Sequence, residues 1–149
     1  KPIYVYLKED PRKLPGVVTG RGVPLSSGTR WLDMSVSNNG NGAPIPAHIA
    51  DKLRGREFKT FDEFREALWL EVSQDPELIA QFSSGNQTRI KQGLIAKAPL
   101  EGWHYGTKEI VKKFQIHHRV AIEYGGSVYD IDNLRIVTPR LHDEIHYRR

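Results

Sequence analysis

FQIHHRVAIEYGGSVYDIDNLRIVTPRLHDEIH, residues 114–146, is the stretch that decides how this chain folds. Its opening residues alternate with the two-residue period of a β-strand. The YGGS sequence at 124–127 predicts a turn, because glycine adopts backbone angles that other residues avoid. Two further extended candidates follow at 127–129 and 134–137, and the Thr-Pro pair at 138–139 suits the cap and first turn of a helix. The predicted order is therefore strand, loop, strand, helix.

The rest of the chain predicts a mainly helical body that follows a loop-rich start. Residues 1–43 are rich in Gly, Pro, Ser and Asn, a composition that favours irregular structure. Within this part, Trp31 is expected to pin the chain to the core. The clearest helix begins at Thr60, where a capping box with Glu63 precedes apolar residues at helical spacing. Further helices are predicted at 44–53, 75–82 and 86–92.

Together these patterns predict one α+β domain, residues 1–149, with a helical body at 44–93 and the strand–strand–helix motif at 114–146. A chain of 149 residues suits a single hydrophobic core. Residues 94–113 have no clear period and are expected to be a surface loop that exposes Trp103 and Tyr105.

The composition excludes several classes of protein and of site. No stretch approaches the roughly 20 apolar residues that a membrane-spanning helix needs. The chain contains no cysteine, so disulfides and thiolate metal sites are excluded and any transition metal must be held by histidine and carboxylate. A formal net charge of +4 and a pI of about 9.4 favour a polyanionic partner.

Histidines are concentrated in the decisive stretch, which holds four of the chain's six. His142 and His146 are four residues apart on the predicted helix, so their side chains can converge on one ion. His117 and His118 are neighbours on the predicted strand, where successive side chains point to opposite faces. One imidazole of this tandem pair can hold an ion while the other accepts a proton from water that attacks a phosphodiester. Taken alone, an i, i+4 pair is also typical of ordinary surface or core histidines.

The decisive stretch resembles the ββα-metal motif of the His-Asn-His nucleases. Its details are similar to the DNase domains of the nuclease bacteriocins, the E-group colicins and S-type pyocins. The similarity extends to GAPIPAHIADKLRGREFKTFDEFREALWLEVSQDPEL at 42–78, and to PRKLPGVVTGRG and RWLD at 11–22 and 30–33. It covers roughly three quarters of the chain, with residues 83–113 as the weak part. The resemblance implies a metal-dependent, largely non-specific DNA endonuclease that is the C-terminal cytotoxic domain of a bacteriocin.

The resemblance also implies a role for each residue that matches the family motif. His117, His142 and His146 would hold a divalent metal ion, either Mg²⁺, Zn²⁺ or Ni²⁺. His118 would be the general base of phosphodiester hydrolysis. Asn133 would brace the loop that faces His118.

Outside the histidines the family pattern is matched less completely. Arg12 would contact phosphate in the active site and Arg54 would contact the DNA backbone, although a solvated surface arginine is the alternative for both. Gln115 stands where these domains usually carry glutamate; a neutral amide can orient a ligand or a water molecule but cannot act as a base. The family's second active-site arginine has no clear match, because Val111 stands at the ungapped position. Lys112 or Lys113 could substitute as a point charge, although lysine does not reproduce the fork of arginine.

The partners that the resemblance implies lie outside this chain. A small acidic immunity protein would bind at 83–113, where six Lys or Arg residues accompany two acids; a solvated basic loop is the alternative. The candidate contacts are Arg89, Lys97, Trp103 and Tyr105. Receptor-binding and translocation domains would precede this segment in a toxin that the producing bacterium secretes and that acts in the cytoplasm of the target bacterium.

Two other functions remain compatible with the same residues. A His-Asn-His nuclease of restriction or phage origin would have the same chemistry in different biology. A non-catalytic nucleic-acid-binding module would use the histidines to hold a structural metal, but that reading leaves one of the tandem histidines without a role.

Overall fold

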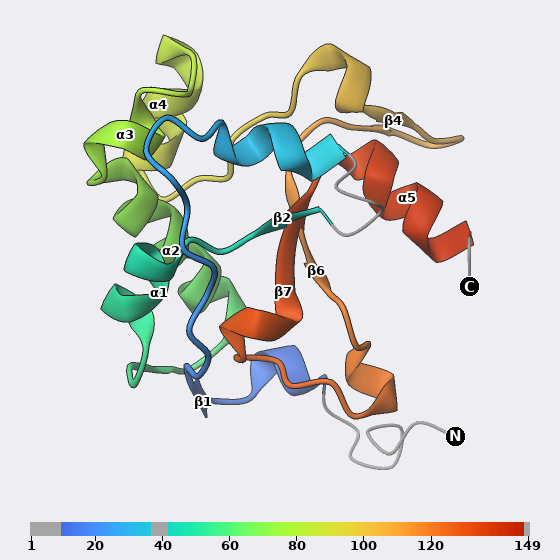
Figure 1. Cartoon of the computed structure of the whole chain (residues 1–149). Coiled ribbons are helices and arrows are strands. Elements are labelled where there is room, and N and C mark those ends of the chain that lie inside the picture. Colours follow the sequence, from blue (N-terminus) through green and yellow to red (C-terminus); the bar gives the residue numbers. More distant parts are fainter. Residues whose placement is uncertain (1–9, 37–41, 148–149) are drawn as a thin grey trace.

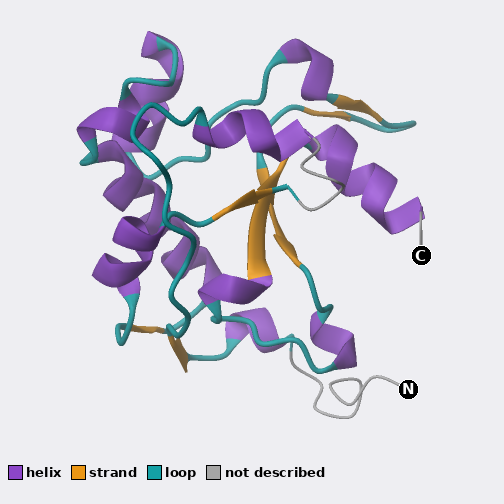
Figure 2. Ribbon diagram, viewed as in Figure 1, coloured by secondary structure: helices purple, strands orange, loops and turns teal. Residues whose placement is uncertain are grey.

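The computed structural model describes residues 10–36 and 42–147. The helices are α1 (Ala47–Leu53), α2 (Phe61–Ser73), α3 (Pro76–Ile79), α4 (Ser84–Lys91) and α5 (Pro139–Tyr147). The short 3₁₀ helices are η2 (Pro11–Lys13), η3 (Trp31–Val36), η4 (Leu100–Gly102), η5 (Ile122–Tyr124) and η6 (Ile131–Asn133). The strands are β1 (Gly16–Val17), β2 (Ala43–Pro44), β3 (Glu57–Phe58), β4 (His104–Tyr105), β5 (Ile110–Val111), β6 (Gln115–His118) and β7 (Leu134–Val137). In Figures 1 and 2, α1 to α4 gather on one side of a small central sheet and α5 lies on the other, so the predicted α+β class is confirmed.

Helix α2 is the centre of the helical body and begins as the sequence predicts. The Thr60 hydroxyl accepts a hydrogen bond from the N–H of Glu63 at 3.3 Å. The Glu63 carboxylate in turn accepts from the N–H of Lys59 at 3.1 Å, one residue before the expected partner. These bonds satisfy N–H groups that the start of a helix leaves without partners.

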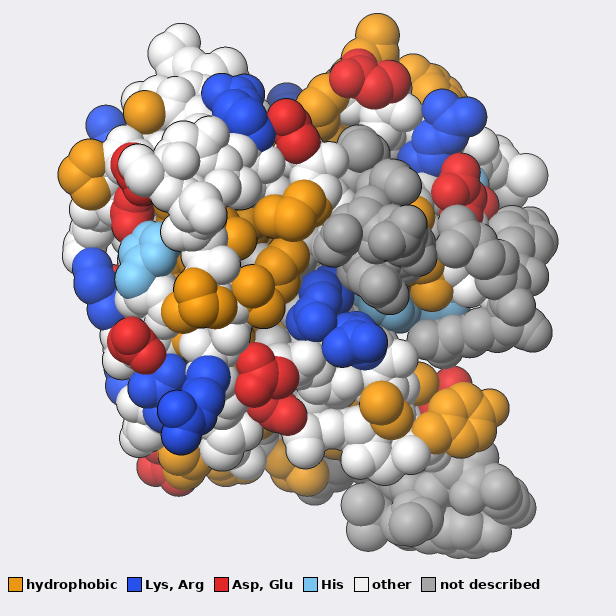
Figure 3. Space-filling model, viewed as in Figure 1, with side chains coloured by type: hydrophobic (Ala, Val, Ile, Leu, Met, Phe, Trp, Pro, Cys, Tyr) orange, Lys and Arg blue, Asp and Glu red, His pale blue; other side chains and the backbone are white. Residues whose placement is uncertain are grey.

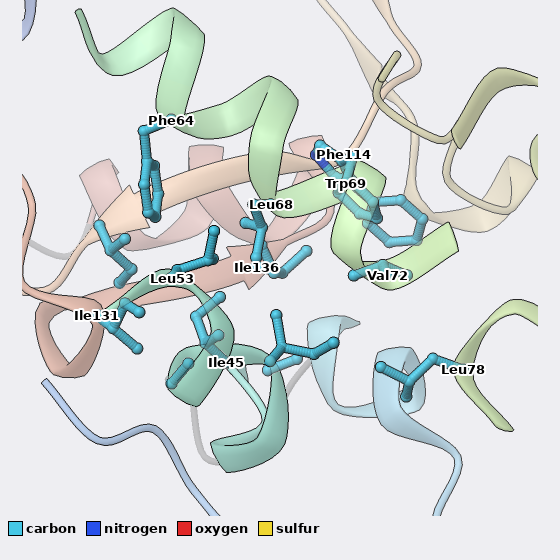
Figure 4. Close-up of a cluster of buried hydrophobic side chains, with 14 of the residues drawn as sticks. Ile45, Leu53, Phe64, Leu68, Trp69, Val72, Leu78, Phe114, Ile131 and Ile136 are labelled. Carbon is cyan, nitrogen blue, oxygen red and sulfur yellow. The ribbon is translucent and has the colours of Figure 1, made fainter. Parts of the chain in front are cut away.

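The apolar face of α2 forms much of the core. Phe64, Leu68, Trp69 and Val72 are buried. Figure 4 shows Phe64 and Leu68 pointing toward Leu53 and Ile136, and Trp69 beside Phe114. Trp31 packs with its ring centroid 6.2 Å from that of Trp69 and donates from Nε1 to the carbonyl of Pro44 at 2.7 Å. The expectation that Trp31 pins the N-terminal segment to the core is therefore confirmed.

A three-stranded antiparallel sheet, in the order β2-β7-β6, carries the decisive stretch. Ile116 pairs with Ile136 and His117 pairs with Arg135 across β6 and β7. Helix α5 follows β7 directly, and the hydroxyl of Thr138 accepts from the N–H of Leu141 at 3.2 Å, as its predicted capping role requires. The sheet and α5 therefore form the predicted strand–strand–helix motif.

Helix boundaries differ from prediction by a few residues, for local reasons. The helix expected at 44–53 begins at Ala47, because Pro44 pairs in the sheet and Pro46 is the extended N-cap. The helix expected at 86–92 begins at Ser84, because the Ser83 hydroxyl already caps it. The one expected at 75–82 ends as α3 at Ile79.

Two predicted segments have a different structure. The prediction of a surface loop at 94–113 is wrong, because β4 and β5 pair there as a hairpin. Trp103, expected to be exposed, is half-buried against the core. Residues 127–129 form no strand. The carbonyls of Ser127 and Val128 accept instead from the side chains of Asn133 and His118, which leaves no strand-to-strand ladder there.

Within the described residues, none of the helices is long and apolar enough to cross a membrane.

Candidate active site and metal centre

Three histidines converge where α5 packs against β6. A nitrogen atom from each of His117, His142 and His146 lies within 4.8 Å of the other two. The Nε2 atoms of His142 and His146 are 3.1 Å apart, as their four-residue spacing on α5 predicts. His117 is only 7% exposed, whereas the two helix histidines are more accessible. The structure therefore brings together the three predicted metal ligands.

The donor set suits a divalent transition metal. Imidazole nitrogens bound tetrahedrally at about 2.1 Å from an ion lie on the order of 3.4 Å from one another. The Nε2 atoms of His142 and His146 are close to that spacing, and a nitrogen atom of His117 lies within 4.8 Å of both. Three protein ligands leave a coordination position open for water or phosphate. The geometry fits Zn²⁺ or Ni²⁺ well by ligand type, while Mg²⁺ prefers oxygen ligands.

His118 faces away from this cluster, toward α2. Its ring centroid lies 5.1 Å from that of Phe61, and burial lowers the pKa of His118, with the Arg12 charge lowering it further. Its Nε2 atom is 3.1 Å from the carbonyl oxygen of Val128. Because a carbonyl oxygen only accepts, Nε2 carries the proton, and in the neutral ring Nδ1 has the free lone pair.

Asn133 ties together the loop that holds His118 in place. Its Oδ1 accepts from the N–H of Val120 at 2.8 Å, and its Nδ2 donates to the carbonyls of Val120 and Ser127, each at 3.1 Å. Ser127 is the residue before Val128, whose carbonyl accepts the hydrogen bond from Nε2–H of His118. The hydrogen bonds of Asn133 therefore reach the backbone at Val120 and Ser127, on the loop that also carries Val128.

A cleft of about 540 Å³ opens beside these residues and is lined by both His118 and His142. We call it the active-site cleft. Arg12 also lines it and pairs at 3.5 Å with Asp10. Gln115 lines the cleft from β6. The structure therefore places both Arg12 and Gln115 beside His118 in the cleft. The cationic lining of the cleft is completed by Arg65, Lys97, Lys112 and Lys113.

A model of one protein family, described as the Colicin/Pyocin-S2 DNase domain, matches residues 16–148 of this chain. The chain belongs to this family. The match includes residues 83–113, where the resemblance in the sequence is weakest. Arg12 lies before the matched range, although the alignment with pyocin-S2 spans 98% of this chain.

Curated relatives and solved structures agree with the family. The chain is 48% identical to colicin-E8 of Escherichia coli over 132 residues, which cover 89% of this chain and 60% of the colicin. It is 46% identical to pyocin-S2 of Pseudomonas aeruginosa over 146 residues, which are 20% of that protein. The DNase domain in the pyocin AP41 DNase–immunity complex superposes with a TM-score of 0.80 at 47% identity, covering 91% of this chain and 99% of that one. The chain thus spans 60% of the length of colicin-E8 and 20% of the length of pyocin-S2.

Arg54 lies apart from the active-site cleft of this DNase domain. Its Nε donates to the carbonyl of Gly20 at 2.9 Å, and its Nη2 pairs with Asp51 at 2.7 Å. The structure brings Arg65 to the cleft instead. Arg65 follows Phe61, whose ring contacts His118, by one helical turn. The sequence alone carries no signal that separates Arg65 from the other arginines, because this contact depends on how α2 packs.

The four candidate partner contacts lie on the 83–113 side of the domain. Arg89 and Lys97 line a second cavity, of about 600 Å³, beside α4. Tyr105 is 61% exposed on the β4–β5 hairpin. Trp103 points inward, donating from Nε1 to the carbonyl of Ala98 at 2.9 Å while Lys112 lies 4.8 Å from its ring centroid.

The two remaining histidines lie outside the cluster, as the sequence predicts, and each has an acidic partner. His48 Nε2 is 2.5 Å from Asp75 Oδ2, and His104 Nε2 is 3.7 Å from Asp143 Oδ1. Both pairs connect neighbouring elements of the fold.

Proposed function

We propose that this DNase domain is a metal-dependent, largely non-specific DNA endonuclease whose general base is His118 and whose metal ligands are His117, His142 and His146. One observation carries the proposal: His118 and His142, a member of the ligand cluster, line the same cleft, while the neighbouring His117 and His118 leave opposite faces of β6. One imidazole can therefore move a proton while the other three hold an ion.

In this mechanism His118 removes a proton from the attacking water through Nδ1. The water oxygen forms a bond to phosphorus as the bond from phosphorus to the leaving oxygen breaks. A lowered pKa keeps the imidazole neutral near pH 7, which a base requires. The Val128 carbonyl holds the ring by its Nε2–H and so keeps Nδ1 available.

The other site residues position the substrate. Arg12 would bind a phosphate oxygen at the wall of the cleft, and Gln115 would orient a ligand or a water molecule. Asn133 would hold the loop and, through it, His118. A bound divalent cation supplies charge neutralisation at the phosphate and the leaving oxygen.

A plasmid assay tests this function. Supercoiled DNA is incubated with the domain and Mg²⁺, Zn²⁺ or Ni²⁺, with and without chelator. Chelator should abolish nicking, and His142→Ala should strongly reduce it. His48→Ala, which removes a histidine outside the cluster, is the matched control. Cleavage that persists in chelator, or in His142→Ala at the control's rate, would contradict the metal site.

We further propose that DNA is bound mainly through its phosphates, as the scattered cations of the cleft suggest. Cleavage should then show little sequence preference and fall steeply as salt rises from 50 to 200 mM. Recurrent cutting at one sequence in unrelated plasmids would count against this, and would favour a restriction-type nuclease.

The partner proposal rests on composition and on the related structures. Both the pyocin AP41 complex and the pyocin S8 nuclease domain, the latter at 44% identity and a TM-score of 0.79, were solved with an immunity protein. We propose that a small acidic immunity protein binds this chain at 83–113 through Arg89, Lys97, Trp103 and Tyr105. Alanine variants of these four should weaken binding of a cognate inhibitor but leave the histidine cluster intact. Unchanged affinity in all four would place the interface elsewhere.

The wider biology is also a proposal. Because the curated relatives are longer than this chain, we infer a toxin with receptor-binding and translocation domains upstream, secreted by its producer and active in the cytoplasm of the target bacterium. Expression of the domain inside a bacterium should damage its DNA, and co-expression of the immunity protein should prevent the damage.

A further inference from the structure

We propose that Arg119 and Arg135 form a second phosphate-binding site on the DNase domain, next to the histidine cluster, that holds a backbone phosphate beside the one being cleaved. The inference rests on the proposed function, since it takes DNA to be the ligand. It concerns two arginines that do not line the active-site cleft.

Strand pairing places both arginines on the face of the sheet that carries His117. Arg135 is the direct cross-strand partner of His117, so their side chains leave the same face. Arg119 follows His117 by two residues and continues the pairing, because its N–H donates to the carbonyl of Asn133 at 2.8 Å. It is therefore the diagonal neighbour of Arg135, a separation of about 7–8 Å that long side chains can bridge. Figure 3 shows Lys and Arg side chains directly beside histidines over β6 and β7.

Backbone carbonyls of the described residues orient the guanidinium of Arg135 but occupy only one of its three nitrogen atoms. Its Nη1 donates to the carbonyls of Asp132 and Leu134, at 3.1 and 2.8 Å. Its Nε and Nη2 atoms make no hydrogen bond within residues 10–36 and 42–147. An arginine edge of this kind matches two oxygens of a phosphate.

Among the described residues, no carboxylate forms an ion pair with Arg119 or Arg135. Across the described part of the chain, neither Arg119 nor Arg135 is within 4.0 Å of an acidic side chain, although the domain forms such ion pairs at Arg12, Arg54, Arg56 and Arg65. Burial lowers the pKa of Arg135, and the Arg119 charge lowers it further, against the opposing effect of Asp132. Two neighbouring cations repel each other, and an anion bound between them would remove that repulsion.

The position of the pair identifies the phosphate. Arg119 lies beyond His118 toward the 120–128 loop, roughly 7 Å along the strand from His117 at 3.3 Å per residue. A phosphate held at Arg119 is displaced along the strand from the metal ligand His117, so it would be a neighbour of the scissile phosphate. Such a contact fixes the register of the strand over the histidines without reading its bases.

The test measures DNA binding in chelator, where no cleavage occurs. Fluorescence anisotropy of a short duplex between 50 and 200 mM salt gives the slope of log K against log salt for wild type, Arg119→Gln, Arg135→Gln and the double variant. Lys91→Gln, which removes an exposed charge from α4, is the matched control. Both arginines serve one phosphate, so the double variant should reduce the slope by about 0.9, and each single variant should account for most of that loss.

The outcomes separate this inference from the proposed function. If the arginine variants keep the slope of Lys91→Gln while His118→Ala abolishes cleavage, the phosphate site is wrong and the nuclease mechanism stands. The exposed Arg119 is the safer variant for folding, and unchanged salt dependence in Arg119→Gln alone overturns a shared site. A smaller slope in Arg119→Gln with an unchanged melting temperature supports it.

Discussion

The Nε2 atom of His118 lies 3.1 Å from the carbonyl oxygen of Val128. Since the carbonyl can only accept, the bond selects the tautomer with hydrogen on Nε2 and a lone pair on Nδ1. The orientation of the proposed base is therefore set by the backbone of the loop between β6 and β7, which has no metal ligand of its own.

This tautomer is directly observable. In ¹⁵N-labelled protein near pH 7, long-range proton–nitrogen spectra should show Nε2 of His118 protonated and Nδ1 not. His118→Ala identifies the signals. A protonated Nδ1 in the neutral ring would contradict the proposed proton path.

Asn133→Ala should impair both stability and cleavage. The substitution leaves polar backbone groups at Val120 and Ser127 without partners, which costs about 1–3 kcal/mol, and it frees the loop that positions His118. A displacement of about 1 Å at a catalytic group can lower the rate on the order of 100-fold. Urea unfolding and plasmid nicking by folded protein measure the two effects.

Asn86→Ala is the control for that variant. Asn86 holds the backbone of Lys97, one of several cations that line the cleft, by a similar pair of bonds, at 2.9 and 3.0 Å. Within the residues that the structure describes, Asn86 forms no hydrogen bond with the loop that carries Val128 or with His118. It should lower stability with a much smaller effect on nicking. Equal losses of nicking in both asparagine variants would show that Asn133 has no specific link to His118.

Stability should depend on pH through His118. Burial holds its folded-state pKa below the ordinary value of 6.5, so below that pH the unfolded chain binds more protons than the folded one. The free energy of unfolding then decreases as pH falls through 6.5, until the folded-state pKa is passed. Urea unfolding in chelator at pH 7.5 and 5.5 should show a larger decrease for wild type than for His118→Phe. An equal decrease would mean that His118 titrates alike in both states.

The two central tryptophans should respond differently to replacement by phenylalanine. Trp31 donates to the buried carbonyl of Pro44 at 2.7 Å, whereas Nε1 of Trp69 is buried without a hydrogen-bond partner among the described residues. Both rings are fully buried, so the packing losses are similar. Trp31→Phe should therefore cost about 1–3 kcal/mol more than Trp69→Phe. Unfolding curves that rank them in the opposite order would contradict this hydrogen-bond assignment.

The sequence predicts best where one local signal is enough. The capping box at Thr60, the Thr138 cap and the four-residue spacing of His142 and His146 each depend on neighbouring residues, and each is seen in the structure. The convergence of His117 with the helix histidines could also be predicted, because the motif resembles a known one.

Contacts between distant segments could not be predicted in the same way. The Val128 carbonyl is a backbone atom and leaves no signature in the sequence. The β4–β5 hairpin consists of two short strands of two residues each, too short to show a period. Arg54 and Arg65 are equally basic in sequence, and only the packing of α2 against β6 shows that Arg65 lines the cleft.

The most direct test of the central claim compares metal content and cleavage in His118→Ala. Three imidazoles bind the ion and the fourth removes the proton, so the variant should bind one Zn²⁺ per chain with wild-type affinity by calorimetry. Its plasmid nicking should nevertheless fall by a factor of about 100 to 10,000. Nicking at the wild-type rate, or loss of the bound ion together with the activity, would contradict this division of roles among the four histidines.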